Sequence, residues 1–328
     1  MLLFGTRGRV TVAAAYRPGE NSWRRLPSAG PAGTFPPYHA VWTGSEMLVW
    51  GQGLAKGYSP RTNRWRNLPD SALLRVHQGF GLVVWTGRQM IGWGGGCCGD
   101  AFSDGVAYTP ATNRWSPLPK SPLAGAQRPL GTWTGRELVV FVGGFDPDGK
   151  PWPARLARAA AYNPTTRTWR RIAPLPEPRG GANVVWDGRE VLVVGGATAN
   201  AAAPRLTRVG FVYDPATNRW RRLPPMESGR VNAVAQWSGK QLLLWGGQTA
   251  LDPKGGTVAA VPAHGLAYDP SANRWSTLPP APILGRIGPT SVWTGRDLIV
   301  WGGDAVTCGK NGQCTTRHFR DGAAFRPR

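Results

Sequence analysis

The segment 266–279, with the sequence LAYDPSANRWSTLP, contains a Tyr and a Trp that lie seven residues apart. Pro stands two residues after the Tyr, and Asn-Arg comes directly before the Trp. Pro, Asn, Asp and Ser favour tight turns, whereas the aromatic residues on either side favour strands. The segment therefore predicts a β-hairpin.

The same hairpin pattern occurs six times along the 328 residues. In each copy Pro follows the Tyr by two residues, and in most copies Asn-Arg precedes the Trp. The pairs are Tyr16/Trp23, Tyr58/Trp65, Tyr108/Trp115, Tyr162/Trp169, Tyr213/Trp220 and Tyr268/Trp275. Successive Trp residues of these pairs lie 42, 50, 54, 51 and 55 residues apart. This period indicates a repeat architecture in which neighbouring units bury each other's apolar surface.

Two further strands precede most of these hairpins. The first is apolar and ends in Trp, and a turn that contains Gly joins it to the second, since Gly readily adopts the positive φ of a tight hairpin. The second strand ends in a Gly pair. The first-strand Trp residues are Trp42, Trp85, Trp133, Trp186, Trp237 and Trp293. The Gly pairs are Gly94-Gly95, Gly143-Gly144, Gly195-Gly196, Gly246-Gly247 and Gly302-Gly303, with Gly51-Gln52 as a degenerate copy.

A unit of four strands and about 50 residues, with the Gly pair, the Tyr and the Trp in register, resembles the kelch repeat. The resemblance extends along nearly the whole chain. It implies an all-β fold, a kelch-type β-propeller in which four-stranded blades surround a central channel. The repeated Tyr and Trp residues are then expected to pack between blades, because large rings fill the wedge between neighbouring sheets.

The two ends of the chain predict how the ring closes. Residues 38–328 hold six repeats, of which the last stops before its fourth strand, whereas residues 13–27 hold a Tyr/Trp hairpin without a preceding first strand. We expect one domain, 1–328, with six blades and with residues 22–26 paired beside the last blade to hide two sheet edges. Residues 1–12 are then an extension. The alternative has seven blades, one of them incomplete, with residues 1–5 as a remnant second strand.

Composition narrows the function classes. The formal net charge is +21, which would suit a polyanion such as nucleic acid. Many of the Arg residues recur beside the repeated Trp residues, so we expect them around the outside of the ring and do not expect nucleic acid as the partner. No apolar run is long enough to span a membrane. We expect a monomer.

Connection lengths indicate which face carries a binding site. The distance from Gly pair to Tyr, or to Phe325 in the last unit, varies from 7 to 23 residues, whereas the distance from Tyr to Trp is always seven. Strand direction alternates within a blade, so all the long connections emerge on one face. Loops on a rigid scaffold commonly carry binding residues. We therefore predict the site on this face, which we call the long-connection face.

Candidate ligand-binding residues fall into three groups. The long connection of the third blade contains Asp146, Asp148 and the off-pattern Trp152. Arg residues precede or open the first strands and suit a carboxylate or phosphate, with structural hydrogen bonding as the alternative role. Two His residues lie near the starts of first strands. The second and third groups are Arg128, Arg179, Arg230, Arg286, His39 and His77. The residues predict no cofactor and no metal.

The four cysteines all lie in long connections. Cys97 and Cys98 are adjacent, and Cys308 and Cys314 flank a short loop. An even number of exposed cysteines predicts disulfides, although four cysteines allow three pairings. Disulfides would place the protein in an oxidising, extracytoplasmic compartment. The opening Met1 to Phe4 is too short to be the core of a secretory signal, so we expect either that the protein stays in the cytoplasm or that its true start lies upstream of Met1.

Two function classes remain. The first is a non-enzymatic propeller that binds a protein or a glycan through the long-connection face. The second is an extracytoplasmic carbohydrate-active enzyme that resembles sialic acid mutarotase or, with fewer matching residues, galactose oxidase. The kelch resemblance implies neither by itself, because one fold hosts many functions.

Overall fold

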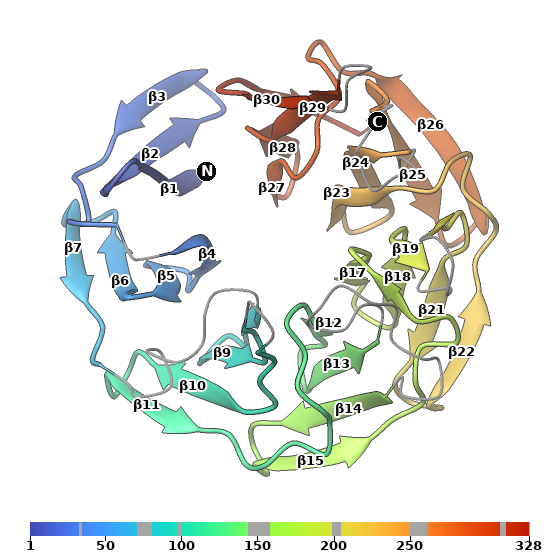
Figure 1. Ribbon diagram of the computed structural model, residues 1–328, viewed down its shortest axis with the longest axis horizontal. Helices are drawn as coiled ribbons and strands as arrows, with labels where there is room; N and C mark the ends of the chain where they lie inside the picture. Colours follow the sequence, from blue (N-terminus) through green and yellow to red (C-terminus); the bar gives the residue numbers. More distant parts are fainter. Residues whose placement is uncertain are drawn as a thin grey trace.

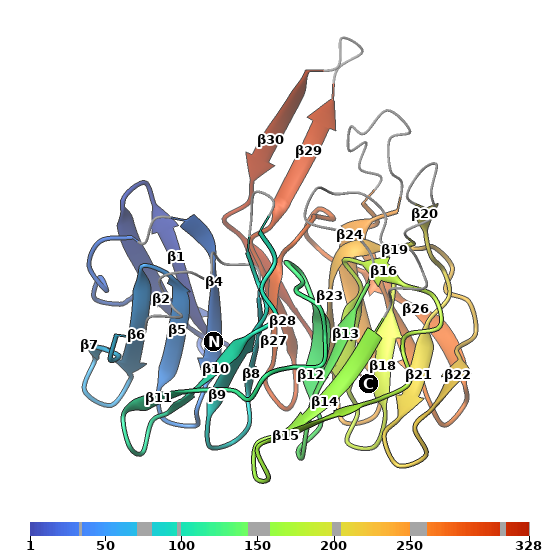
Figure 2. The ribbon, with the colours of Figure 1, turned by 60° about the horizontal axis from the view of Figure 1, so that its bottom comes forward.

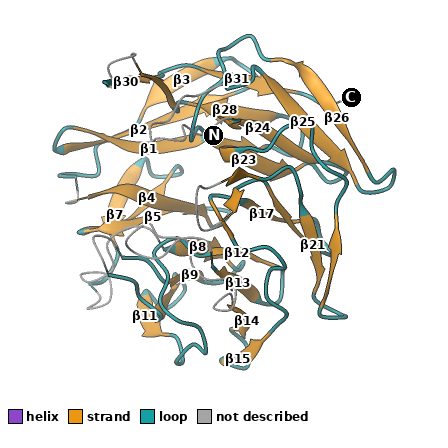
Figure 3. Ribbon diagram, turned by 45° about the vertical axis from the view of Figure 1, so that its right-hand side comes forward, coloured by secondary structure: helices purple, strands orange, loops and turns teal. Residues whose placement is uncertain are grey.

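The computed structural model describes residues 1–32, 35–70, 81–96, 100–143, 158–198, 205–249, 261–308 and 313–327. Throughout these ranges the chain forms strands and loops without any helix, as the colouring of Figure 3 shows. The sheets stand around a common centre like the blades of a wheel (Figure 1). The all-β propeller expected from the sequence is confirmed.

Five antiparallel sheets have four strands each and follow one another in chain order. Their strands are, in the first blade, β4 (Phe35–Trp42), β5 (Met47–Gln52), β6 (Leu54–Ser59) and β7 (Arg64–Asn67); in the second, β8 (Leu82–Trp85), β9 (Met90–Trp93), β10 (Gly105–Thr109) and β11 (Arg114–Pro117); in the third, β12 (Leu130–Trp133), β13 (Leu138–Val142), β14 (Arg158–Asn163) and β15 (Thr168–Arg171); in the fourth, β17 (Asn183–Trp186), β18 (Val191–Val194), β21 (Phe211–Asp214) and β22 (Arg219–Arg222); and in the fifth, β23 (Val231–Trp237), β24 (Leu242–Gln248), β25 (His264–Asp269) and β26 (Arg274–Pro280).

Two sheets at the ends of the chain have three strands each. The N-terminal sheet consists of β1 (Leu2–Arg7), β2 (Val10–Arg17) and β3 (Ser22–Arg25), and the C-terminal sheet of β27 (Thr290–Trp293), β28 (Leu298–Trp301) and β31 (Gly322–Phe325). Two small additional sheets are β16 (Arg179–Gly180), β19 (Ala197–Thr198) and β20 (Arg205–Leu206), and β29 (Asp304–Cys308) with β30 (Cys314–His318).

The N-terminal sheet corrects one expectation. Residues 22–26 were expected to pair with the last blade, but β3 pairs with β2, with Trp23 opposite Tyr16, and β2 pairs in turn with β1. The sheets meet through side chains: the rings of Trp23 and Trp301 lie 4.3 Å apart. In the described residues the N-terminal segment thus forms a sheet of its own, as in the alternative that uses residues 1–5 as a second strand.

A left-handed residue closes each outer hairpin. Asn273, five residues after Tyr268, has a φ of 48°, and its side-chain oxygen accepts a hydrogen bond from the Tyr268 hydroxyl at 2.9 Å. The same bond links Tyr108 with Asn113 at 2.7 Å. Asn tolerates the left-handed region better than other non-Gly residues. The recurring Asn before Arg-Trp is therefore explained by turn geometry.

Neighbouring blades are joined by their fourth-strand Trp residues. Each indole Nε1–H donates to the backbone carbonyl that lies four residues after the Trp of the preceding blade. The donors and acceptors are Trp65 with Pro27, Trp115 with Pro69, Trp169 with Pro119, Trp220 with Ala173 and Trp275 with Pro224, at 2.8 to 3.1 Å. These bonds repeat the same geometry around the ring.

The Arg that follows the Trp strengthens the same contact. Arg66 donates to both carboxylate oxygens of Glu46 in its own blade, at 3.0 and 2.8 Å, and to the hydroxyl of Tyr108 in the next blade at 3.0 Å. Arg170 and Arg221 bind Glu137 and Glu190 in the same way. These recurring Arg residues therefore belong to the scaffold. Their positive charges are paired with Glu carboxylates of the same blade.

Apolar side chains from adjacent sheets form the core. One cluster joins Ile91 and Trp93 of the second blade to Leu138 and Val140 of the third. Another joins Leu192 and Val194 of the fourth blade to residues of the fifth. The core is thus divided into wedges between neighbouring blades, as the aromatic repeat predicts.

We predict that Trp169→Phe lowers the free energy of unfolding by about 1–2 kcal/mol, because the carbonyl of Pro119 loses its donor. Urea unfolding followed by circular dichroism measures this change. Trp23→Phe is the matched control, since Trp23 is 40% exposed and its indole N–H makes no hydrogen bond within the described residues. Equal losses in both variants would contradict a role for the bond.

Candidate interaction surfaces

The long-connection face carries the elements that interrupt the repeat. The β29–β30 hairpin and the β19–β20 strands both rise from the same side of the ring in Figure 2. Both lie in connections between a second and a third strand, as the sequence predicts. Cys97, Cys98 and Trp152 lie outside the described residues, so their predicted place on this face stays a prediction.

The β29–β30 hairpin is the most prominent feature of this face, and we call residues 304–318 the arm. Every residue of β30 is exposed. Apart from a bridge between Asp304 and Ile287 at its base, the two strands of the arm pair only with each other in the described residues, and the arm projects well beyond the ring (Figure 2). Cys308 and Cys314 are register partners at its far end. A two-stranded hairpin without further support is marginally stable in water.

The base of the arm is held firmly. Backbone hydrogen bonds run in both directions between Ile287 and Asp304, at 2.8 and 2.9 Å. Arg286 donates to a carboxylate oxygen of Asp321 at 2.8 Å, and its guanidinium carbon lies 4.0 Å from the ring centroid of Phe319. The Arg286 guanidinium lowers the pKa of the Asp321 carboxyl through this hydrogen bond. The ring thus fixes the direction in which the arm projects.

Arg179, Arg230 and Arg286, all predicted as candidate ligand-binding residues, are fully buried. Each donates to the carbonyl of the first Gly of its blade's Gly pair: Gly195 at 3.4 Å, Gly246 at 3.3 Å and Gly302 at 3.3 Å. Burial lowers the pKa of Arg179 to about 10, although nearby Glu177 opposes this shift, so the group stays charged at neutral pH. The structure places these guanidinium groups inside the wall, in contact with backbone carbonyls.

The remaining candidates are dispersed or lie outside the described residues. Arg128 is exposed. His39 is half-buried on β4, and its ring centroid lies 6.4 Å from that of Trp50. Asp146, Asp148, Trp152, His77, Cys97 and Cys98 lie outside the described residues. The predicted ligand-binding set therefore does not converge on one described site, and its role stays a prediction.

Neither a metal-binding cluster nor a membrane-spanning helix is found in the described residues. Within the part of the chain that the structure describes, no three His, Cys, Asp or Glu side chains gather closely enough to hold a metal ion. Over those same residues no helix has the length and apolarity needed to cross a membrane.

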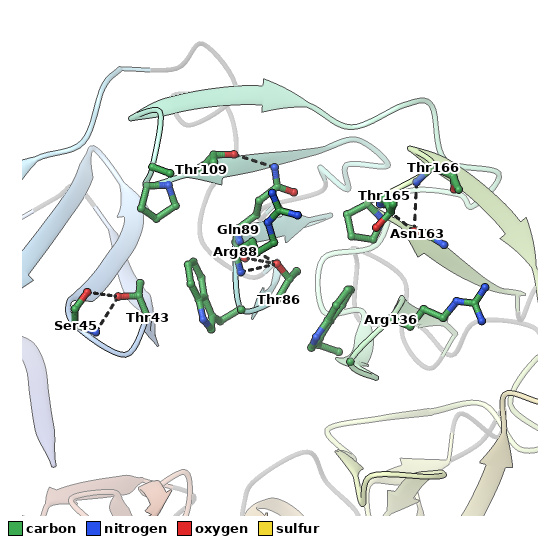
Figure 4. Close-up of a pocket in the computed structure, with 17 residues that line it drawn as sticks. Thr43, Ser45, Thr86, Arg88, Gln89, Thr109, Arg136, Asn163, Thr165 and Thr166 are labelled. Carbon is green, nitrogen blue, oxygen red and sulfur yellow. Dashed lines mark hydrogen bonds between the residues drawn. The ribbon is translucent and has the colours of Figure 1, made fainter.

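A groove of about 940 Å³ lies on the opposite face, which carries the tight turns. Turns of the first three blades line it, including Thr43, Thr86, Arg88, Arg136 and Asn163 (Figure 4). Sequence reasoning missed this groove because every one of these positions reads as an ordinary turn residue. The combination of Thr-Gly-Arg turns in the second and third blades was the available signal.

Comparison with known proteins agrees with this architecture. Residues 178–227 match the Kelch motif family model. Beta-scruin of Limulus polyphemus is 30% identical over 142 residues, which cover 42% of this chain and 15% of that protein. Kelch-like protein terF of Aspergillus terreus is 32% identical over 154 residues, 45% of this chain and 32% of that protein. Kelch-like protein 25 of Xenopus tropicalis is 29% identical over 148 residues. The chain spans less than a third of the length of these relatives.

We predict that Arg179→Met lowers the free energy of unfolding by about 1–3 kcal/mol, because buried carbonyls lose their donor. The control Arg189→Met removes an exposed Arg of the same blade and should change stability by less than about 0.5 kcal/mol. Thermal and urea unfolding measure both. Unchanged stability of the Arg179 variant would contradict a structural role.

Proposed function

Because this chain is a kelch-repeat β-propeller protein, we propose that it is a protein-interaction module that binds its partner through the arm and the surrounding long-connection face. The observation that carries the proposal is the arm itself, a hairpin that projects from the ring and whose strand β30 is exposed at every residue. The Kelch motif and the kelch-like relatives support an interaction role.

The arm has the properties of a recognition element. Both of its strands have an edge that pairs with no other strand in the described residues, and an exposed edge can add a strand from another chain. The outward side chains of Thr315, Thr316 and Arg317 are polar or charged. Its firmly held base reduces the loss of conformational freedom on binding, which favours affinity.

We further propose that Cys308 and Cys314 form a disulfide and that the protein works in an oxidising, extracytoplasmic compartment. The register of β29 and β30 supports this pairing. A bridge at this position would limit fraying of a hairpin that has no third strand. Disulfides persist in oxidising compartments and are rare elsewhere.

We predict that a photo-reactive benzoylphenylalanine at Thr316 forms a covalent adduct with a protein of the source extract, whereas the same residue at Ala216 does not. Ala216 is equally exposed but lies on a tight turn of the fourth blade. Denaturing electrophoresis and mass spectrometry detect the adduct.

A competition experiment tests whether the adduct depends on the arm. Excess unlabelled chain should abolish the adduct, whereas a variant in which two glycines replace residues 304–318 should not compete. Equal labelling from both positions, or competition by the variant without the arm, would refute the proposal. Glycan-array binding or sialic acid mutarotation, with no adduct, would favour the glycan-binding or enzymatic alternative.

We predict that peptide mapping without reductant finds Cys308 linked to Cys314. Reduction should lower the thermal midpoint of arm opening, measured by hydrogen exchange of β29 and β30, because a short disulfide loop contributes about 2–3 kcal/mol. The double variant Cys308→Ser, Cys314→Ser should show no response to reductant in the arm. Free thiols at both positions in oxidised protein would refute the pairing.

A further inference from the structure

The groove on the tight-turn face has the dimensions of a ligand site. Its volume of about 940 Å³ falls within the range of about 300–1,000 Å³ that small-molecule sites occupy. Two strand-ending indoles, Trp85 and Trp133, contribute to its wall together with turns of three blades. Hydroxyl and amide side chains supply most of its polar lining, as Figure 4 shows for Thr109, Asn163 and Thr165.

The lining of this groove is positively charged. It includes two basic residues, Arg88 and Arg136, and none of its residues is Asp or Glu. Both Arg residues are exposed, and neither guanidinium has a hydrogen-bond or ion-pair partner among the described residues. The scaffold Arg residues differ, since Arg66 and Arg170 are each bound to a Glu. Within the part of the chain that the structure describes, the two groove Arg residues therefore have no structural partner.

Two other blades carry an acidic residue at a position where the second and third blades carry a neutral one. The residue after the repeat Tyr is Asp214 in the fourth blade and Asp269 in the fifth, but Thr109 in the second and Asn163 in the third. Asp214 lies close enough to Arg189 for the cation to contribute to lowering the pKa of its carboxyl, after the larger effects of Thr217 and Ala216. The second and third blades thus keep the turn Arg and lack the carboxylate.

The second blade otherwise preserves the local arrangement. Gln89 donates its amide N–H to the Thr109 hydroxyl at 2.8 Å. In the fifth blade Gln241 contributes to lowering the pKa of the Asp269 carboxyl, after the larger effects of Ser271 and Ala272. The fold therefore accepts either residue at this position. The neutral residue leaves the positive potential of the groove uncompensated.

From these observations we propose that the groove binds an acidic oligosaccharide, a sugar chain that bears carboxylate or sulfate groups. Arg88 and Arg136 bind the anionic groups through charge-assisted hydrogen bonds. The Thr and Asn side chains bond sugar hydroxyls, and the Trp rings provide apolar faces against which a sugar ring packs. Nucleic acid fits less well, because its binding grooves follow the phosphate backbone with many cations.

Isothermal titration calorimetry of the full chain with trigalacturonate and with a chondroitin sulfate tetrasaccharide tests the proposal. At least one of these probes should bind, and Arg88→Gln and Arg136→Gln should each weaken it about 10-fold, which corresponds to the loss of one charged contact. The matched control Arg189→Gln changes the same turn position in the fourth blade and should alter affinity less than about 2-fold, since additive long-range charge effects are small at physiological salt.

A second variant tests whether binding requires the absence of a carboxylate at position 109. Thr109→Asp gives the second blade the residue that the fourth and fifth blades already have, so the protein should keep its unfolding midpoint. The substitution should nevertheless weaken binding of the probe at least as much as Arg88→Gln does, about 10-fold or more, because the new carboxylate neutralises Arg88 and repels the anionic groups. Circular dichroism verifies the fold, and the pair of measurements separates misfolding from loss of the site.

Several results would overturn the proposal. Binding that Arg189→Gln weakens as strongly as Arg88→Gln does would assign the affinity to net charge alone. Equal binding of neutral maltotriose, or no binding of either acidic probe, would also refute it. Binding of a thymidine oligonucleotide with the same dependence on Arg88 and Arg136, and without glycan binding, would replace the sugar with nucleic acid. None of these results affects the arm, which lies on the other face.

Discussion

The hydrogen bond from each fourth-strand indole to the carbonyl of the preceding blade is the constraint on which the ring depends. A partly buried carbonyl needs a donor, and its loss costs free energy of the order of 1 kcal/mol per bond. The bond requires the Trp to stand at a fixed position after the Tyr and the acceptor to stand four residues after the previous Trp. Insertions are therefore tolerated only in connections that leave the position of the Trp and of its carbonyl acceptor unchanged. The second-to-third connections satisfy that condition, and the arm lies in one of them.

The same contact accounts for much of the unusual charge. Arg66, Arg170 and Arg221 follow their Trp residues directly and bridge a Glu of their own blade to a Tyr of the next. Arg179, Arg230 and Arg286 hold the Gly pairs from inside the wall. Net charge alone therefore overstates how much of the surface is available to a polyanion. Among the exposed Arg residues, Arg88 and Arg136 stand out because they line a groove that contains no Asp or Glu.

Sequence reasoning predicted the fold well because the repeat records local geometry. The Tyr, Pro, Asn and Trp of one hairpin interact with one another, so spacing alone reveals them. It mispaired residues 22–26 because a short strand such as β3 can pair on either side, and the partner depends on three-dimensional arrangement. The buried Arg residues were ambiguous for a similar reason: the acceptor of Arg179 is the carbonyl of Gly195, which lies 16 residues away, directly after β18.

A ring of similar blades presents similar turns at every position, so a localised site requires departure from the repeat. On one face the departure is an insertion in a second-to-third connection, which forms the arm. On the other it is a substitution, in which Thr109 and Asn163 stand where Asp214 and Asp269 stand in later blades. Both kinds of residue occupy the same position after the repeat Tyr, and Gln89 donates to the Thr109 hydroxyl in the second blade. The substitution removes a negative charge and leaves the length of the turn unchanged. Connection lengths therefore do not reveal it.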